Sequence, residues 1–339
     1  MPLYLTTIIQ PVQFARNDGS LVVGSSMKIA VLGGGGAMGG IFGARLADAG
    51  HAVTLIDVAK PAVDAINDNG LKIDAKDGTS RTYTVAASTE PAKVGAVDLV
   101  MNFVKCYHTE AAITAARAMM GPDTAVLTLQ NGWGNAPKIA AIVGDDRVLV
   151  GLTYHSGMLL GPGHIKHPGI GMTYVGELDG KTTPRLEAIG AALKSAGFET
   201  TLSPSILTEV WKKLCLNVCT LPTSALLRFF AHQLVAYDGT KAEMRALLVE
   251  AVAVAKVQGI ALDIEERWSA ITSLLEKAVG GKSSMLQDVE GKRRTEIDVI
   301  NGAIVEAGKK HDVPTPHNDA MVNLIKSLEE AYLAESKPA

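Results

Sequence analysis

Short apolar runs alternate with helical patterns along the first part of the chain. Residues 27–32 form an apolar run that meets a glycine-rich stretch, and apolar residues at helical spacing then lead to a second run at 51–57. Two further buried-strand patterns, at 97–104 and 124–129, flank a helical pattern at 109–120. Alternation of this kind predicts a parallel sheet with helices on its faces.

The pattern becomes less regular in the middle of the chain. Three strand-like pieces at 149–154, 163–167 and 171–176 lie among Gly and Pro residues, and we expect them to extend the same sheet in antiparallel fashion. A helical pattern at 185–196 and a short strand pattern at 199–202 follow. The α/β part of the chain is therefore predicted to end near residue 202.

The rest of the chain has only helical periodicity. Long stretches with apolar residues at helical spacing lie at 207–225, 241–258 and 297–311. The sequence thus predicts an α/β domain over residues 27–202, followed by an all-α domain over residues 203–339.

The first 26 residues differ in pattern from the rest of the chain. Residues 1–26 end in Gly24-Ser25-Ser26 and carry no basic segment before their apolar start, so a signal peptide is not expected. We interpret this segment as a loosely ordered extension, and an added strand or partner-binding tail is the alternative.

The loop after the first strand carries a dinucleotide-binding pattern. Gly34, Gly36 and Gly39 satisfy G-x-G-x-x-G, with Ala37 and Met38 between the last two. The first glycine allows the tight turn, the second lets the backbone approach a pyrophosphate, and the third permits close packing of helix on strand. The N–H groups at the start of the following helix then face the phosphates. The first domain is therefore predicted to be of the Rossmann type.

An acid at the end of the second strand bears on the choice of dinucleotide. Asp57 follows Gly39 by 18 residues, the place where a carboxylate binds the ribose hydroxyls of NAD and repels a 2′-phosphate. The three residues after Asp57 include no Arg that could bind a 2′-phosphate, although Lys60 could reach one. Asp57 favours NAD(H), and an exposed turn acid is the alternative interpretation.

Composition and charge exclude several classes of protein. The 339 residues include 32 Lys and Arg and 35 Asp and Glu, for a net charge of −3, so overall charge does not hold the protein to nucleic acid or to an anionic membrane. No stretch of about 18 uncharged apolar residues predicts a membrane span. Three cysteines without Cys-x-x-Cys spacing, and scattered histidines, predict neither a metal site nor disulfides, so the cytoplasm is the expected compartment.

Several blocks of the chain resemble the ketopantoate reductases (2-dehydropantoate 2-reductases). They are the glycine loop after 27–33, EVWKKLCLN at 209–217, SSMLQD at 283–288, TEIDVING at 295–302 and QNG at 130–132. The resemblance covers nearly the whole chain after the N-terminal extension. It implies NADP(H)-dependent reduction of ketopantoate to pantoate, a step of pantothenate and coenzyme A biosynthesis.

The resemblance also implies roles for particular residues. Lys213 matches the family's catalytic lysine, which protonates the developing alkoxide, and Glu296 matches the carboxylate that orients the substrate or the lysine. Asn217, one turn after Lys213, and Ser284 match substrate-binding positions. Without the resemblance, Lys213 would be interpreted as a solvated charge, Glu296 as a helix N-terminal acid and Ser284 as a helix cap.

Two more positions match the cofactor side of the family's site, and two depart from its pattern. Asn131 and Lys105 each follow a predicted strand and correspond to residues that place the nicotinamide cofactor. Leu221 and Gly281 stand where the family often has Asn. The alternatives are therefore reduction of another 2-keto acid, an NAD-dependent 2-hydroxy acid dehydrogenase, or a non-catalytic dinucleotide sensor. Apolar faces in the helical part leave a homodimer open.

Overall fold

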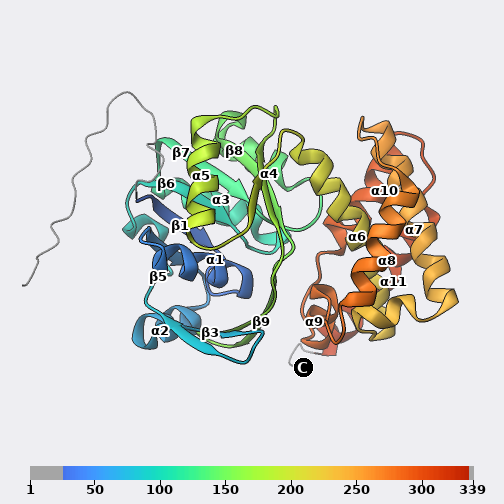
Figure 1. The fold of residues 1–339 in the computed structure, drawn as a ribbon, viewed down its shortest axis with the longest axis horizontal. Coiled ribbons are helices and arrows are strands. Elements are labelled where there is room, and N and C mark those ends of the chain that lie inside the picture. The colour runs from blue at the N-terminus through green and yellow to red at the C-terminus, as the bar shows by residue number, and fades with distance from the viewer. Residues whose placement is uncertain (1–25, 336–339) are drawn as a thin grey trace, which may run out of the picture.

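The computed structural model describes residues 26–335 of the chain, so the predicted extension at 1–26 lies outside the described residues except for Ser26. An α/β domain and a helical region lie side by side, on the left and on the right of Figure 1. The last strand of the α/β domain ends at Leu202 and the first helix of the helical region begins at Ile206. The predicted division at residue 203 lies between these two elements.

The main sheet of the α/β domain has eight strands in the order β12-β11-β8-β7-β6-β1-β2-β5. All strands from β8 to β5 run parallel to their neighbours, whereas β11 is antiparallel to β8 and β12 is parallel to β11. The order from β5 to β8 is that of a Rossmann fold, which confirms the predicted α/β class. The strands are β1 (Lys28–Leu32), β2 (Ala52–Ile56), β5 (Ala86–Ser88), β6 (Val97–Asn102), β7 (Met120–Thr128), β8 (Val148–Thr153), β11 (Thr173–Glu177) and β12 (Thr200–Leu202).

Helices cover both faces of the main sheet. The buried side chains of α1 and α5 share one core with one face, and those of α3 and α4 share a second core with the other. The helices of this domain are α1 (Ala37–Asp48), α2 (Lys60–Asn69), α3 (Thr109–Ala116), α4 (Asn135–Val143) and α5 (Pro184–Ser195).

A second sheet of four strands, in the order β4-β3-β10-β9, packs on α1. It consists of β3 (Leu71–Ala75), β4 (Ser80–Tyr83), β9 (Ser156–Gly161) and β10 (His164–Gly169). The expectation that residues 163–167 extend the main sheet is therefore wrong. β10 pairs with β3 instead, and β3 escaped the sequence pattern because its strand and its partner β4 are rich in polar residues.

Two glycines let α1 lie between the sheets. A Cβ added to Gly43 would approach Leu55 Cδ2 of the main sheet to 2.3 Å, and one added to Gly40 would approach Ile165 Cδ1 of the second sheet to 2.4 Å. Contacts below 3.0 Å require the neighbouring side chain to shift, so glycine at these positions lets Leu55 and Ile165 pack directly against the helix. Part of the high glycine content therefore serves packing around the helix that follows the glycine loop.

The helical region packs around the long helix α6. Buried side chains of α6, including Trp211, Cys215 and Cys219, form one core with those of its neighbours, so the two cysteines act as small apolar residues. Among residues 26–335, no helix is both long and apolar enough to cross a membrane. The helices are α6 (Ile206–Leu227), α7 (Asp238–Val257), α8 (Ile264–Lys277), α9 (Ser284–Glu290), α10 (Asn301–Lys310) and α11 (Pro316–Glu335).

Helix α6 contains a proline whose effect a neighbouring helix compensates. Pro222 has no N–H, so the carbonyl of Val218 loses its partner within the helix. The buried amide of Asn301 on α10 donates to Val218 O at 3.1 Å and to Asn318 Oδ1 at 3.0 Å. The Asn301 amide thus replaces the hydrogen bond that Pro222 cannot donate, and α6 continues past the proline to Leu227.

The helix predicted at 297–311 is divided in two. A short 3-10 turn at Ile297–Val299 is followed by Ile300, with φ −105° and ψ −95°, before α10 begins. Glu296 therefore lies in an irregular segment ahead of α10, and this segment faces the α/β domain.

Candidate active site

The glycine loop presents backbone donors at the carboxyl end of β1. Gly36 caps α1 with an extended backbone, no side chain bonds to the first turn, and that turn contains no acid. A Cβ on Gly39 would lie 2.4 Å from Gly33 O, whereas one on Gly36 would meet only that same oxygen, at 3.2 Å. Gly39 is thus needed for close packing, and Gly36 leaves room above the helix N-terminus. Such an N-terminus fits the pyrophosphate of a dinucleotide.

Asp57 is tied to the glycine loop. Its Oδ2 accepts a hydrogen bond from Gly35 N and its Oδ1 one from Ala59 N, both at 2.9 Å. The residue is half-buried, and Val58 beside it is 94% exposed. Lys60, which the sequence offered as a phosphate ligand, pairs with Asp64 on its own helix at 2.7 Å. The carboxylate therefore lies at the edge of the glycine loop, and the nearby Lys60 is already paired.

Two loops at the carboxyl ends of β6 and β7 are joined by Gln130. Its amide oxygen accepts from Asn102 Nδ2 at 2.8 Å and its amide nitrogen donates to Val104 O at 2.7 Å. The same nitrogen donates to Thr109 Oγ1 at 2.8 Å. These bonds hold the backbone before Lys105 and the start of α3 after it, and Lys105 and Asn131 follow neighbouring strands at the edge where open α/β sheets bind ligands.

Lys213 of α6 reaches across to this edge. Its Nζ donates to Asn131 Oδ1 at 2.8 Å, over a sequence separation of 82 residues. Asn217 lies one turn further along the same face of α6 and is 7% exposed, and within residues 26–335 no group hydrogen-bonds to its amide. The amide is therefore left for a ligand beside the Lys213 ammonium.

Burial tunes the acidity of Lys213. The side chain is partly exposed, yet the protein atoms around it disfavour its charged form and lower its pKa to about 8. The charge of Glu296 acts in the opposite direction and favours the ammonium. A lysine with such a pKa is mostly protonated at pH 7, so it can donate a proton there, and it loses its charge as the pH rises through 8.

Glu296 is buried and faces the α/β domain. Its Oε1 accepts from the backbone N of Cys106 at 3.1 Å, and its Oε2 lies 3.5 Å from Lys105 Nζ. The interpretation of Glu296 as a simple helix N-terminal acid does not fit this position, since a 3-10 turn and not α10 follows it.

Lys105 binds the helical region in this structure. Its Nζ lies 2.6 Å from Asp288 Oδ2 on α9, in addition to its contact with Glu296. The sequence pointed to Lys105 as a cofactor ligand, and that role stays a prediction. Asp288 was not expected at the site, and its position within SSMLQD is the only signal that could have indicated it.

Ser284 begins α9 but does not cap it. The cap is Ser283, whose Oγ accepts from Leu286 N at 3.1 Å and donates to Ser224 Oγ of α6 at 3.1 Å. The hydroxyl of Ser284 has no such partner among the described residues. Ser283 therefore anchors α9 to α6 and leaves the neighbouring Ser284 hydroxyl available.

Gly132 allows the two parts of the molecule to approach. Its φ is +85°, a Cβ on it would lie 2.3 Å from Val299 O, and the next residue, Trp133, donates its N–H to the same carbonyl at 2.8 Å. The sequence contained this glycine in QNG but gave no reason for it. The structure shows that it is a point of close backbone contact beside Asn131.

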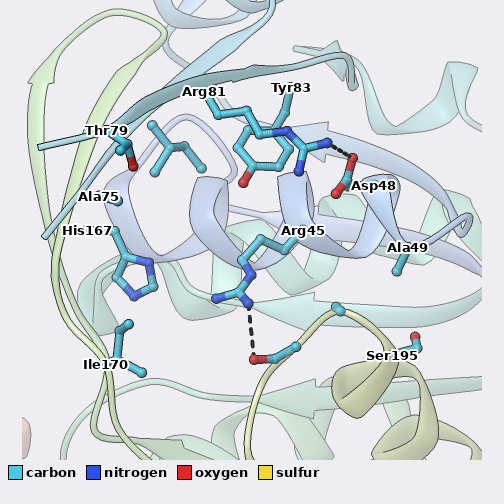
Figure 2. Close-up of a pocket in the computed structure, with 13 residues that line it drawn as sticks. Arg45, Asp48, Ala49, Ala75, Thr79, Arg81, Tyr83, His167, Ile170 and Ser195 are labelled. Atoms are coloured by element: carbon cyan, nitrogen blue, oxygen red, sulfur yellow. Dashed lines mark hydrogen bonds and ion pairs between the residues drawn. The ribbon is translucent and has the colours of Figure 1, made fainter. Parts of the chain in front are cut away.

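A cavity in the described part of the chain lies away from these residues. It has a volume of about 450 Å³ and lies between α1, the second sheet and α5, with Arg45, Arg81 and His167 on its walls (Figure 2). Arg45 donates to Gly197 O and Arg81 pairs with Asp48 there. None of the predicted site residues lines it, so we place the candidate site by its side-chain contacts. No cluster of three or more His, Cys, Asp or Glu side chains within residues 26–335 could hold a metal.

A Rossmann-type sheet with a bare helix N-terminus, facing a lysine of tuned acidity, is the arrangement of a nicotinamide-dependent oxidoreductase that acts on a CH–OH group. The family model described as ketopantoate reductase PanE/ApbA matches residues 29–180, and that of the C-terminal part of ketopantoate reductase PanE/ApbA matches residues 205–329. The chain belongs to the ketopantoate reductase family.

Relatives and solved structures agree with this assignment. The chain is 33% identical over 300 residues to the 2-dehydropantoate 2-reductase of Halobacterium salinarum, covering 87% of this chain and 97% of that one. A ketopantoate reductase from Ralstonia eutropha has a TM-score of 0.82 at 30% identity, covering 90% of this chain and 99% of that one. D-mandelate dehydrogenase in complex with NADH and anilino(oxo)acetate has a TM-score of 0.84 at 28% identity, with the same coverage.

Proposed function

We propose that the protein reduces a 2-keto acid to the 2-hydroxy acid with a reduced nicotinamide dinucleotide, and that ketopantoate is its substrate. The observation that carries this proposal is the contact of Lys213 with Asn131, which brings a proton donor of the helical region to the sheet edge beside the dinucleotide cradle. The 2-dehydropantoate 2-reductases among the relatives support ketopantoate as the substrate.

The residues of this chain supply the proton and the geometry. A bound reduced nicotinamide supplies the hydride for the carbonyl carbon. Lys213 donates a hydrogen bond to the keto oxygen and gives it the proton as negative charge develops. Asn131 fixes the direction of the ammonium, and Glu296 favours its charged form.

Substrate and cofactor are held from opposite sides. Asn217 binds the substrate's oxygen atoms next to Lys213, and Ser284 binds its carboxylate. The loop of Gly34 and Gly36 and the first-turn residues of α1 hold the pyrophosphate. Those first-turn residues are Ala37, Met38 and Gly39. Asn131, besides holding Lys213, lies where it can orient the nicotinamide.

We propose that NADH binds at least as well as NADPH, although the family resemblance favours NADP(H). Asp57 is fixed by two backbone N–H groups at the place where a 2′-phosphate would stand, and the residue beside it is the uncharged Val58. Lys60 is already paired with Asp64. The NADH complex of D-mandelate dehydrogenase shows that this fold accepts NADH.

A second function, NAD-dependent 2-hydroxy acid dehydrogenase, has one specific observation in its favour. Leu221, two turns after Lys213 on α6, is apolar and 8% exposed. An apolar residue there binds no hydroxyl of a substrate, and losing one such hydrogen bond costs about 1–3 kcal/mol. A dinucleotide sensor without activity has no such support, since Lys213 and Glu296 are both in place.

Initial rates separate these functions. The full-length protein is assayed with ketopantoate, 2-ketoisovalerate and phenylglyoxylate, each with NADH and with NADPH. The highest kcat/KM on ketopantoate supports the proposal, and a preference for phenylglyoxylate supports the dehydrogenase. Binding of NADH without oxidation by any of the three acids contradicts both and favours a sensor. The predicted homodimer and cytoplasmic location are separate predictions, and light scattering tests the first.

A further inference from the structure

Two buried carboxylates share one ammonium at the seam between the α/β domain and the helical region. The side chains of Asp288 and Glu296 are 5% and 8% exposed, and Lys105 Nζ lies 2.6 Å from the first and 3.5 Å from the second. The shorter contact is the one with Asp288, which the proposed reaction does not use.

Each carboxylate has a further donor of its own. Asp288 Oδ1 accepts from Arg293 Nε at 3.2 Å, and Arg293 N donates to Asp288 O at 2.8 Å. Glu296 Oε1 accepts from Cys106 N at 3.1 Å. Both carboxylates are thus fixed in place, and the position of the Lys105 ammonium between them decides how far each negative charge is neutralised.

Resting on the proposed function, we propose that Asp288 is a positioning residue. It draws the Lys105 ammonium to its own carboxylate at 2.6 Å and leaves it at 3.5 Å from Glu296, so that Glu296 is only partly neutralised and its charge also acts on Lys213. An isolated buried ammonium is costly, and Lys105 is held charged because two carboxylates flank it. Burial alone would lower its pKa, yet Glu296 and Asp288 together raise that pKa above its usual range.

Loss of the Asp288 charge has a definite consequence. Lys105 would then move to Glu296, the one carboxylate left within its reach, and neutralise it. Lys213 would lose the charge that favours its protonated form, and burial, which lowers its pKa, would then act unopposed. Activity, which needs the protonated lysine, would therefore fall off at a lower pH than in the parent.

The charged and titratable groups around Lys213, Glu296 and the neighbouring Cys106 come from four segments. Only Glu296 and the Lys105–Asp288 pair change in this scheme, since Glu209 pairs with Lys212, and Asp298 pairs with Arg294 and Lys326. The segments contribute Glu209 and Lys212 from α6, Lys105 and Cys106 after β6, Lys138 from α4, and Asp288, Arg293, Arg294, Glu296 and Asp298 from α9 to the 3-10 turn.

The decisive variant is Asp288→Asn, which keeps an oxygen for Arg293 but removes the charge. In the full-length enzyme, kcat/KM is measured from pH 6 to pH 10. We expect the alkaline inflection to move down by about half a unit to one unit, and the rate at pH 6.5 to change less than about threefold. A uniform loss of rate at every pH, with the inflection unmoved, would show a merely structural role and overturn the proposal.

Two further variants show whether Lys105 carries the effect. Asp298→Asn removes one carboxylate of the same segment, which pairs with Arg294 and Lys326, and should leave the inflection in place. In a Lys105→Gln background, Asp288→Asn should no longer shift it, since no ammonium remains to move. A shift of equal size in that background would mean that Asp288 acts through space, against the proposal.

A second experiment measures the pKa of Lys213 without using turnover, and it compares two variants rather than one. The rate at which acetic anhydride acetylates Lys213, followed by peptide mass spectrometry against pH, reports the lysine's pKa directly. Lys105→Gln alone should raise this pKa by freeing Glu296, and Asp288→Asn should lower it. If no 2-keto acid is reduced but these opposite shifts appear, the proposed function fails and the positioning role stands. If neither shift appears, the positioning role fails.

Discussion

The two sides of the candidate site are built from different kinds of group. The α/β domain presents backbone N–H groups and small residues, from Gly33 to Gly39, with one carboxylate at their edge. The helical region presents long charged side chains, Lys213, Asp288 and Glu296, each held by a partner across the seam or beside it. The first side therefore depends on volume, because a Cβ in the wrong place displaces the loop. The second depends on charge, because its residues are fixed by ion pairs and hydrogen bonds.

Removing the Lys213 ammonium should give the largest effect on the helical side. We expect Lys213→Ala to lower turnover at least 100-fold, because general acid catalysis contributes about 10²–10⁴-fold, and to leave dinucleotide affinity nearly unchanged. The control is Lys212→Ala on the same helix, where Lys212 pairs with Glu209 at 2.9 Å. Steady-state kinetics and fluorescence titration with NADH measure the two quantities. Normal turnover in Lys213→Ala would refute the proposed reaction.

The matching change on the other side adds one carbon without changing charge. A Cβ at position 39 would lie 2.4 Å from Gly33 O, so Gly39→Ala must displace the loop or α1. Overpacking of this kind costs about 1–3 kcal/mol, and we expect NADH affinity to fall by about 30-fold while kcat at saturation changes little. Gly239→Ala, near the start of α7 with no atom within 4 Å of its Cβ, is the control. Unchanged affinity in Gly39→Ala would break the contrast between volume and charge.

The two sides also differ in their buried titratable groups, since the α/β domain buries a neutral pair. His155 Nδ1 and His167 Nε2 lie 2.9 Å apart beside Phe198, and burial, then the charges of His167 and Arg45, lower the pKa of His155 to about 4. In the unfolded chain the ordinary value of 6.5 applies. The unfolded state thus takes up a proton first as the pH falls, so stability is full above pH 7 and declines through 6.5 toward 4.

Because of this pair, we expect the free energy of unfolding to be about 2 kcal/mol lower at pH 5 than at pH 7.5. Urea unfolding followed by circular dichroism at both values measures it. His155→Phe places an apolar ring beside Phe42 and Phe198, and should remove most of that difference, although it lowers stability at pH 7.5 because His167 loses its partner. The exposed His311 gives the control, His311→Gln, which should keep the full difference. A parent protein equally stable at both pH values would contradict the neutral pair.

The sequence predicted most of the main sheet, but of the second sheet it predicted only the strand at 163–167 and assigned that strand to the main sheet. The apolar runs at 27–32 and 97–104 mark buried parallel strands, which need no knowledge of their neighbours. β3 pairs with β10 across about ninety residues of chain, and the polar segments of β3 and its other partner β4 resemble loops. The break at Ile300 was missed for a related reason, because apolar periodicity continues through it while the backbone turns to carry Glu296 to the seam.

The sequence likewise indicates site residues that belong to local motifs, but not those whose roles depend on contacts between distant segments. Lys213 and Glu296 could be assigned from their motifs, and the glycine loop from spacing alone. Asp288 lies 183 residues from Lys105, and Gly132 is required by the carbonyl of Val299, so neither role is visible in a local pattern. Contacts between the α/β domain and the helical region decide both.

The smallest expected effect concerns Asp57, the one carboxylate at the edge of the glycine loop. Asp57→Asn keeps an oxygen for the Gly35 N–H but removes the repulsion of a 2′-phosphate. We expect the ratio of NADPH to NADH affinity to rise about tenfold, corresponding to about 1.4 kcal/mol, with kcat unchanged. Lys60→Ala, which breaks the exposed pair with Asp64, should leave the ratio within about twofold because surface ion pairs contribute little. Fluorescence titration of both variants with each cofactor measures it. If the parent already binds NADPH far more tightly than NADH, Asp57 does not select the cofactor. The glycine-loop side would then depend on volume alone.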